Sequence, residues 1–299
     1  MKIFLVSLIV AVACLQHAIS AEEKAVTDQR VFETPEAAAD AVVAALKTGE
    51  NAPLIEIFGA KHKDQIGTVD TARDRELRGR VAKMAEDHRT FTTNVDGSVT
   101  IVVGYEAWPF PFPLVKTDGG WQFNTDAGVE ELLKRRIGEN ELSAIAALRA
   151  YVNAQRQYAA EPRDGTEVRQ FAQKVQSSPG KKDGLYWPID AAKNETPSPA
   201  GPEIKDSKTP YAGYYFKILT GQGAAAPAGK YSYIINGRLI GGYAMVAWPA
   251  DYGKTGVMTL AVNHYGDVYQ KDLGPKTATL AAGIQEYNPD KSWTKVSDD

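Results

Sequence analysis

Aromatic residues beside prolines are the candidates for ligand chemistry that stand out in this chain of 299 residues. Trp108, Trp187 and Trp248 each precede a proline. Flat aromatic faces bind sugars, peptides and proline-rich strands. We therefore take six residues of these segments as ligand-binding candidates: Trp108, Phe110, Tyr186, Trp187, Trp248 and Tyr252. The alternative is structural, with each tryptophan filling the edge of a core while the proline stiffens the chain.

Histidines and carboxylates offer less specific chemistry. His62 lies among lysines and aspartates that could form a metal or acid–base site, and the alternative is a solvated loop. Four carboxylates lie in or beside aromatic loops, where a pair could hydrolyse a glycosidic bond: Asp183, Glu203, Asp206 and Asp251. The chain has neither an HExxH pair nor a GxSxG turn. The sequence therefore predicts no metal and no cofactor, and it leaves the catalytic residues of any reaction unknown.

The overall charge argues against two classes of function. The chain has 34 Lys and Arg against 37 Asp and Glu, a net charge of −3. This balance does not suit a nucleic-acid binder that relies on overall positive charge, nor a polybasic membrane-surface protein. The single cysteine excludes an intrachain disulfide. A composition of 43% apolar and 24% charged residues is typical of globular proteins, and the length suggests two domains or one large one.

Residues 1–20 have the pattern of a secretory signal peptide. Lys2 precedes an apolar run over residues 3–15, and Ala18 and Ser20 are the small residues before the expected cleavage. We predict a periplasmic or secreted protein with no transmembrane segment once the signal is removed. An uncleaved anchor is an alternative, but the run is shorter than the roughly 20 residues that span a bilayer. A further alternative is a lipoprotein anchored through Cys14.

Residues 21–138 indicate an N-terminal α+β region. Thr34, Pro35 and Gly49 predict the ends of a first helix. A short helix near 54–59 follows, and then a longer helix over 70–88 whose inward residues should be Leu77, Val81, Met84 and Ala85. The remaining segments predict a small antiparallel sheet: a strand at 99–103, an extended edge or loop over 109–113 and a hairpin at 114–123.

Residues 139–299 indicate a second α+β region. Asp126 is expected to cap a helix that Gly138 closes, and a separate long helix covers 140–160. The apolar stripe of this long helix should be Leu142, Ile145, Leu148 and Val152, with Ala144, Ala147 and Arg149 on other faces. The stripe should pack on strands near 214–219, 242–248 and 257–262. A Pro/Gly-rich loop occupies 177–210.

The predicted fold class is therefore α+β. It begins with helices and a small antiparallel sheet, and continues with a long helix packed on a second antiparallel sheet. The predicted divisions are a signal peptide over 1–20, an N-terminal region over 21–138 and a second region over 139–299.

Several runs together resemble one exported bacterial family. They are Trp108–Pro111, Gly184–Pro188, Gly213–Phe216, Ala247–Gly256 and Tyr269–Pro275. On these runs, and over about Glu33 to the C-terminus, the chain is identified as a member of domain of unknown function family 2950. This resemblance implies no activity and no catalytic residues.

The two regions also resemble other folds. The N-terminal order of helices and strands, with Gly119-Gly120-Trp121-Gln122-Phe123, is similar to the cone of nuclear transport factor 2-like proteins. The helix over 141–159, with final strands at 255–259 and 266–269, is similar to a type IV pilin head. A pilin carries its apolar stem directly before this helix, whereas a whole region intervenes here. The second resemblance therefore implies a pilin-like head reused as a soluble module, and a shared fold does not set the function.

These observations favour a non-enzymatic binding or assembly module of the cell envelope. Its partner would be an envelope protein or a glycan, not nucleic acid, and the sequence gives neither the ligand nor the oligomeric state. The alternative is a periplasmic hydrolase whose carboxylates converge in a pocket, so enzymatic activity stays open. Two close carboxylates with shifted pKa values would favour the hydrolase, and a flat aromatic patch would favour the binding module.

Overall fold

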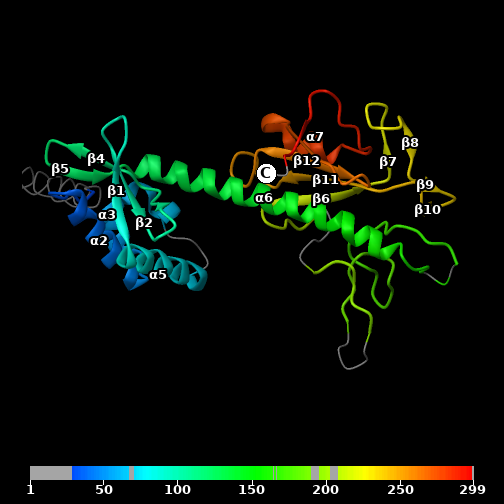
Figure 1. The fold of residues 1–299 in the computed structure, drawn as a ribbon, viewed down its shortest axis with the longest axis horizontal. Coiled ribbons are helices and arrows are strands. Elements are labelled where there is room, and N and C mark those ends of the chain that lie inside the picture. The colour runs from blue at the N-terminus through cyan, green and yellow to red at the C-terminus, as the bar shows by residue number, and fades with distance from the viewer. Residues whose placement is uncertain are drawn as a thin grey trace, which may run out of the picture. The chain divides into compact units, whose positions relative to one another are not determined.

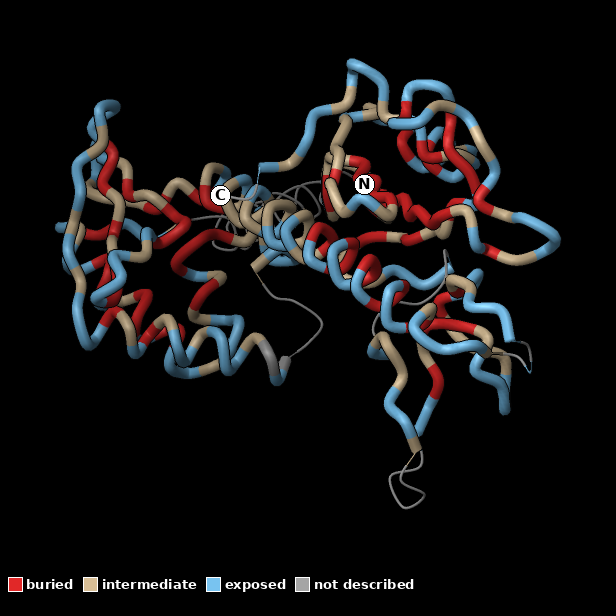
Figure 2. The backbone as a smooth tube through the Cα atoms, turned by 45° about the vertical axis from the view of Figure 1, so that its right-hand side comes forward, coloured by how far each residue is buried: buried red, intermediate tan, exposed pale blue. Residues whose placement is uncertain are grey.

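The computed structural model describes residues 29–66, 71–163, 165, 167–189, 195–202 and 208–297. The predicted signal peptide over 1–20 and Cys14 lie outside the described residues, as do Asp70, Glu203 and Asp206. The chain divides into two compact units, residues 1–133 and 134–299. Each unit has its own buried core (Figure 2). The fold is α+β, as predicted.

Helices form the first half of the N-terminal unit (Figure 1). They are α2 (Pro35–Thr48), α3 (Ala52–Phe58), η1 (Ala60–His62), α4 (Lys63–Ile66) and α5 (Thr71–Asp87). The Thr34 side chain accepts a hydrogen bond from the Ala37 amide at the start of α2, and Gly49 ends α2 at φ 72°. Both ends of this helix were therefore predicted correctly.

An antiparallel sheet completes this unit. Its strands are β1 (Arg89–Thr93), β2 (Val99–Val103), β3 (Trp108–Pro109), β4 (Leu114–Thr117) and β5 (Gly120–Phe123), in the order β1-β2-β4-β5 with β3 paired to β2. The core between sheet and helices contains rings of Phe58, Phe112 and Phe123. The predicted strand and hairpin are confirmed. Of residues 109–113, Pro109 lies in β3 and residues 110–113 form a loop.

The predicted inward face of α5 is partly wrong. Leu77 is 49% exposed, whereas Ala82 and Ala85 are buried. Helix α5 packs against α2, and small alanines allow that close approach. Val81 and Met84 are half-buried against the N-terminal core, so three of the four predicted inward residues are confirmed and only Leu77 is wrong.

The helix α6 (Thr125–Tyr158) is one continuous element of 34 residues, which corrects the predicted break at Gly138. A Cβ at Gly138 would meet nothing within 4 Å, so this glycine has no packing role there. One glycine costs a helix about 1 kcal/mol relative to alanine, which the neighbouring turns outweigh. The cap is also not Asp126: the Asn124 side chain accepts a hydrogen bond from the Ala127 amide.

The C-terminal unit is built on a five-stranded antiparallel sheet. Its strands, in spatial order, are β14 (Thr294–Lys295), β13 (Val268–Asp272), β12 (Met258–Asn263), β11 (Ala244–Pro249) and β6 (Tyr214–Leu219). Smaller hairpins join β7 (Gly221–Gln222) to β8 (Tyr231–Ser232) and β9 (Ile234–Ile235) to β10 (Arg238–Leu239). The helices η3 (Gly274–Lys276) and α7 (Thr277–Ala282) follow β13 in the chain.

Helices cover both faces of the sheet at β11, all six residues of which are buried (Figure 1). On one face, the hydroxyl of Tyr151 in α6 donates to the Ala244 carbonyl at 3.2 Å. On the other face, the ammonium of Lys217 in β6 donates to the Ala282 carbonyl of α7 at 2.7 Å. Successive side chains of a strand point to opposite faces, which explains why β11 has no polar alternation.

The backbone of Gly256 packs directly against an aromatic ring beside this sheet. Gly256, just before β12, packs against the Tyr214 ring so closely that a Cβ would overlap the ring and its hydroxyl. The Tyr214 hydroxyl donates to the Met258 carbonyl at 2.9 Å. Glycine at 256 therefore leaves the space that the tyrosine occupies.

The predicted faces of the long helix are right at four positions and wrong at three. Ile145, Leu148 and Val152 are buried, and Arg149 is exposed. However, Leu142 is 69% exposed, and Ala144 and Ala147 are buried instead. Ala144, Ala147, Leu148 and Tyr151 recur at helical spacing and are all buried. The buried face is therefore turned away from Leu142.

Candidate functional site

The six predicted ligand-binding residues lie on separate segments of the two units. In the N-terminal unit, Phe110 is buried and Trp108 is half-buried, with ring centroids 6.5 Å apart in an edge-to-face contact. Phe110 also contacts Phe112 and Phe123 in the core. Phe110 therefore belongs to the N-terminal core, and Trp108 packs against it.

Trp187 is buried inside the Pro/Gly-rich segment, and Tyr186 beside it is half-buried. The guanidinium of Arg163 lies 5.2 Å and the ammonium of Lys182 5.4 Å from the Trp187 ring. The indole N–H donates to the Thr196 carbonyl at 3.3 Å. Trp187 thus anchors a segment whose described residues have no helix or strand between 177 and 210.

Trp248 and Tyr252 lie at the end of β11 and in the loop after it. Trp248 is buried against Tyr215, with ring centroids 5.8 Å apart. The Tyr252 hydroxyl donates to a carboxylate oxygen of Asp272 at 3.1 Å, and this bond raises the pKa of Tyr252. Tyr252 therefore closes its own loop against β13.

The carboxylates proposed for a hydrolase are held by local partners. Asp183 accepts hydrogen bonds from the Lys174 ammonium at 2.7 Å and from the Ser178 amide at 2.7 Å. The Ser178 hydroxyl also donates to Asp183, at 3.0 Å. The Lys174 bond and the two Ser178 bonds together lower the pKa of Asp183 to about 2. Asp251 pairs with Lys254 at 2.9 Å. Each carboxylate therefore stabilises its own loop.

The histidines lie in three different settings. His62 and Lys61 both contact Asp126 in the first turn of α6, and both lower the pKa of Asp126. The exposed His88 stacks on Tyr105, with centroids 5.1 Å apart. His264 lies among tyrosine rings. In the part of the chain that is described, no three His, Cys, Asp or Glu side chains come together as metal ligands.

A groove runs beside α6 in the C-terminal unit, with a volume of about 380 Å³. We call it the α6 groove. Its lining residues are mostly apolar and small: Ser143, Ala146, Ala147, Ala150, Tyr151, Val175, Leu185, Pro199, Ala200, Gly201, Tyr211 and Met245. Helix α6 supplies one wall and the Pro/Gly-rich segment another. The groove can therefore hold an apolar chain segment.

The polar groups of the α6 groove are few. The Tyr151 hydroxyl is buried and already donates to Ala244, and burial raises the pKa of Tyr151. Ser143 and Tyr211 are half-buried, and they supply two further hydroxyls. Carboxylates, histidines and amines do not contribute to the lining among the described residues. This chemistry suits binding better than proton transfer.

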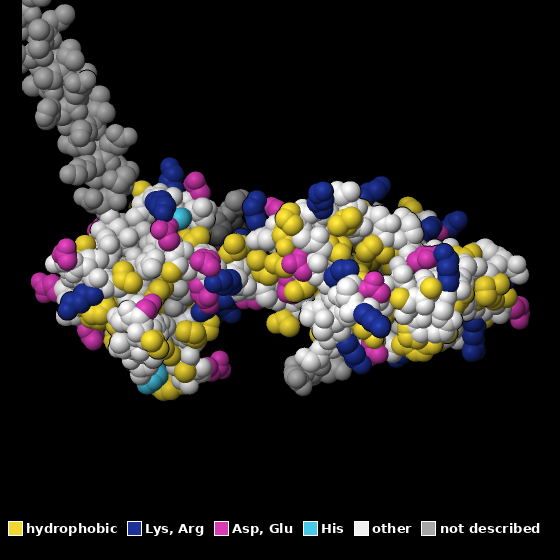
Figure 3. Space-filling view, turned by 90° about the horizontal axis from the view of Figure 1, so that it is seen from above, with side chains coloured by type: hydrophobic (Ala, Val, Ile, Leu, Met, Phe, Trp, Pro, Cys, Tyr) yellow, Lys and Arg dark blue, Asp and Glu magenta, His cyan; other side chains and the backbone are white. Residues whose placement is uncertain are grey.

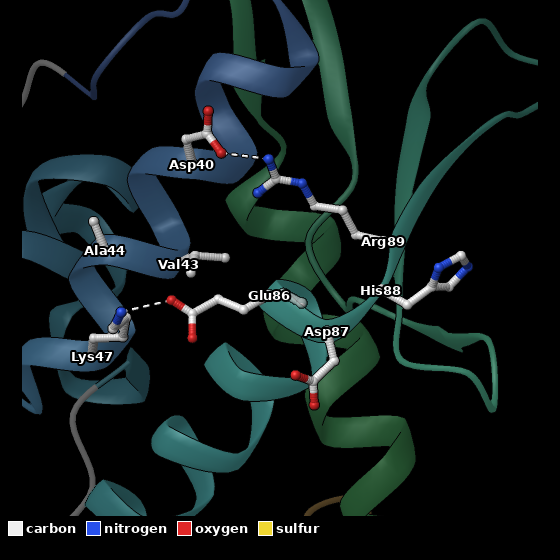
Figure 4. A pocket seen from close by; sticks show the side chains of 9 residues that line it. Asp40, Val43, Ala44, Lys47, Glu86, Asp87, His88 and Arg89 are labelled. Atoms are coloured by element: carbon white, nitrogen blue, oxygen red, sulfur yellow. Dashed lines mark hydrogen bonds and ion pairs between the residues drawn. The ribbon is translucent and has the colours of Figure 1, made fainter.

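A second, charged groove of about 710 Å³ lies in the N-terminal unit between α2 and the junction of α5 with β1 (Figure 4). Two ion pairs cross it: Asp40 of α2 with Arg89 of β1, and Lys47 of α2 with Glu86 of α5 at 2.6 Å. His88 points away from these pairs in Figure 4. Helix α2 supplies the acid of the first pair and the base of the second. The two pairs therefore link α2 to both β1 and α5.

Charged side chains of both signs are interspersed with apolar ones on the face shown in Figure 3. This mixture agrees with the near balance of acids and bases in the sequence. Exposed ion pairs such as Lys47–Glu86 contribute only about 0–1 kcal/mol each. The charged groove is therefore best explained as a helix–sheet contact, and the α6 groove is the candidate functional site.

Sequence reasoning missed the α6 groove. Its helical wall consists of alanines, which carry little signal for either a core or a site. The available signal was an excess of small residues in Ala144-Ile145-Ala146-Ala147, together with Pro199-Ala200-Gly201. The groove forms only because the Pro/Gly-rich segment returns to α6, and the hydrophobic pattern of a loop does not encode that.

Comparison with curated proteins and with solved structures found no match. The likenesses to a nuclear transport factor 2-like cone and to a pilin head therefore stay predictions. A helix suited to crossing a bilayer does not occur in the described part of the chain. The model of one family, described as "Protein of unknown function (DUF2950)", matches residues 29–296, and it extends through both units and the α6 groove. The chain therefore belongs to the DUF2950 family of proteins of unknown function.

Proposed function

We propose that this protein is an exported, non-enzymatic binding or assembly module of the cell envelope, and that the α6 groove holds an apolar segment of its protein partner. The observation that carries the proposal is the lining of the groove. It combines small aliphatic side chains with a half-buried tyrosine, Tyr211, in a volume that fits a few side chains. The predicted signal peptide over 1–20 supports the location.

The lining favours a protein segment over a glycan. A sugar site needs several hydrogen-bonding side chains arranged around a flat ring face. The α6 groove instead offers aliphatic contacts from Val175 and Leu185, with alanines that let a main chain come close. The hydrolase alternative receives less support, because Asp183 and Asp251 serve their own loops.

Filling the groove tests this proposal. Ala146 is exposed on the groove wall, so Ala146→Trp should occupy the space without disturbing the core. Ala278 is exposed on α7, and Ala278→Trp is the matched control. Short fluorescent peptides of graded aliphatic content serve as probes, and binding is followed by anisotropy. We expect aliphatic peptides to bind the parent and Ala278→Trp, and to lose at least tenfold in affinity on Ala146→Trp. Equal binding to all three proteins, or no binding to the parent, would refute the proposal.

A further inference from the structure

Strand β1 forms one edge of the sheet in the N-terminal unit. Just before this strand, the Gly104 amide donates to the His88 carbonyl at 2.8 Å. Successive residues of an antiparallel strand alternate between bonding to the neighbouring strand and facing away from it. Because residue 88 bonds toward β2, the amide and carbonyl groups of Arg89, Phe91 and Thr93 point away from β2.

The two edges of this sheet differ. At the β5 edge, the Phe32 amide donates to the Trp121 carbonyl at 2.8 Å, and the Trp121 amide donates to the Phe32 carbonyl at 2.7 Å. At the β1 edge, the outward amides and carbonyls of Phe91 and Thr93 have no hydrogen-bond partner among the described residues. A row of unpaired main-chain groups is a template for a further strand.

Strand β1 also lacks the features that protect a sheet edge from such pairing. It contains no proline, glycine or lysine, and its five residues pair with β2 without a bulge. Its one charged side chain, Arg89, is paired with Asp40 of α2. Thr90, Thr92 and Thr93 are exposed and small, so a strand can approach the edge.

We propose that β1 receives an extended segment of a partner protein, which adds one strand to the N-terminal sheet. This site lies in the other unit from the α6 groove and is a second binding surface. An extended main chain presents an amide and a carbonyl to one side at every second residue, about 7 Å apart. The outward groups of Phe91 and Thr93 have the same two-residue repeat, so an extended polypeptide is the ligand that satisfies them.

A single segment fits this edge better than a second copy of the chain. Helix α5 contacts β1, and α2 reaches it through the Asp40–Arg89 pair. Two copies joined edge to edge by a two-fold axis would bring both sets of helices to the same face. One added strand needs only about 5 Å beside β1.

The side chains of β1 define the chemistry of the segment. Phe91 is half-buried against the N-terminal core, and Thr90 and Thr92 are exposed on the opposite face of the strand. Directly paired residues of neighbouring strands point to the same face and contact each other. The partner residue level with Phe91 should therefore be apolar, because it covers the exposed part of the ring. Its two neighbours should be polar and β-branched, beside the threonines.

Fluorescent peptides that alternate valine and threonine are the probes, and anisotropy measures their binding to the full-length chain. A peptide N-methylated at every second amide keeps one edge that can form hydrogen bonds, whereas a peptide N-methylated at every amide keeps none. We expect the first peptide to bind at least tenfold more tightly than the second. This comparison uses the unaltered protein, so it does not depend on the folding of any variant.

A proline on β1 locates the binding edge. Thr93→Pro removes an amide that faces away from β2, so it leaves the bonds between β1 and β2 in place. Thr93→Ala is the matched control, because it loses the same side chain and keeps the amide. We expect Thr93→Pro to weaken binding at least tenfold, and Thr93→Ala and Ala146→Trp to bind like the parent. Thermal melts confirm that each variant folds.

Several outcomes would overturn the inference. They are failure of the half-methylated peptide to bind, equal binding of both peptides, equal binding to Thr93→Pro and Thr93→Ala, and loss of binding in Ala146→Trp. A dimer of the parent in sedimentation velocity that Thr93→Pro dissociates would also overturn it, because the occupant would be a second copy. The proposed function is tested separately, by the aliphatic peptides and the α6 groove, and it stands if only the β1 site fails.

Discussion

Glu141 of α6 holds the start of β12 at Val257. One carboxylate oxygen, Oε1, accepts hydrogen bonds from the Val257 amide at 2.8 Å and from the adjacent Met258 amide at 3.0 Å. The neighbouring Asn140 side chain donates to the Thr255 carbonyl at 2.9 Å. Two successive helix residues thus bind the loop between β11 and β12, and position α6 on the sheet.

Removal of this carboxylate should destabilise the C-terminal unit. Glu141→Ala leaves two half-buried amides without their charged acceptor, which costs about 1.5–3 kcal/mol. Glu141→Gln keeps a neutral oxygen acceptor and should cost less than half as much. Urea unfolding monitored by tryptophan fluorescence measures both. Equal stability of the parent and Glu141→Ala would show that water replaces the carboxylate without loss.

The packing of α6 predicts a contrast between adjacent residues. Leu148 is fully buried, so Leu148→Ala should lower the free energy of unfolding by about 2–5 kcal/mol. Arg149 is exposed, and Arg149→Ala should change it by no more than about 0.5 kcal/mol. Urea titration of the parent and of both variants measures these changes in the free energy of unfolding. A stable Leu148→Ala protein together with a collapsed Arg149→Ala protein would mean that the helix faces elsewhere.

His264 should make stability depend on pH. Burial among the rings of Tyr233, Tyr243 and Tyr265 lowers the pKa of His264 below 6.5, although a backbone bond with Tyr243 opposes the shift. The unfolded chain therefore binds a proton at a higher pH than the folded chain does. The free energy of unfolding therefore has its full value, as far as His264 is concerned, above pH 6.5. It decreases progressively as the pH falls below 6.5.

Unfolding free energies measured on both sides of this pH check the prediction. The decrease on acidification should be smaller in His264→Gln, which has no titrating group at this position. The Nδ1 atom of His264 is buried without a hydrogen-bond partner among the described residues, so the variant should tolerate the loss of the ring nitrogen. An identical decrease in both proteins would assign the pH dependence to other groups.

Export should remove the predicted signal peptide. The small residues Ala18 and Ser20 predict cleavage that leaves Ala21 as the first residue. Intact-mass measurement of the exported protein gives the new N-terminus directly. A mature chain that begins at an acylated Cys14 would instead identify a lipoprotein.

Local signals predicted most of the elements because they act over a few residues. Thr34 and Gly49 mark the ends of α2 through hydrogen bonds and backbone conformation that need no distant partner. The hairpin predicted at 114–123 likewise forms, with Thr117 paired to Gly120 across its turn. The fold class followed from adding such segments together.

Tertiary contacts explain the failures. Glycine is common at helix ends, so Gly138 predicted one. However, the stretches of α6 on both sides of Gly138 are helical, and the helix continues through it. Leu142 has the spacing of a core residue, yet it is 69% exposed, and Ala144 and Ala147 are buried instead. The α6 groove depends on where residues 199–201 return to the helix, which no local pattern specifies.

The contact of Gly256 with the Tyr214 ring has an evolutionary consequence. A side chain at 256 and an aromatic ring at 214 compete for one volume, so neither position can vary independently of the other. Across the DUF2950 family, glycine at 256 should accompany tyrosine at 214, and larger residues at 256 should occur only where a small residue stands at 214. Two positions 42 residues apart in the sequence should therefore change together over descent.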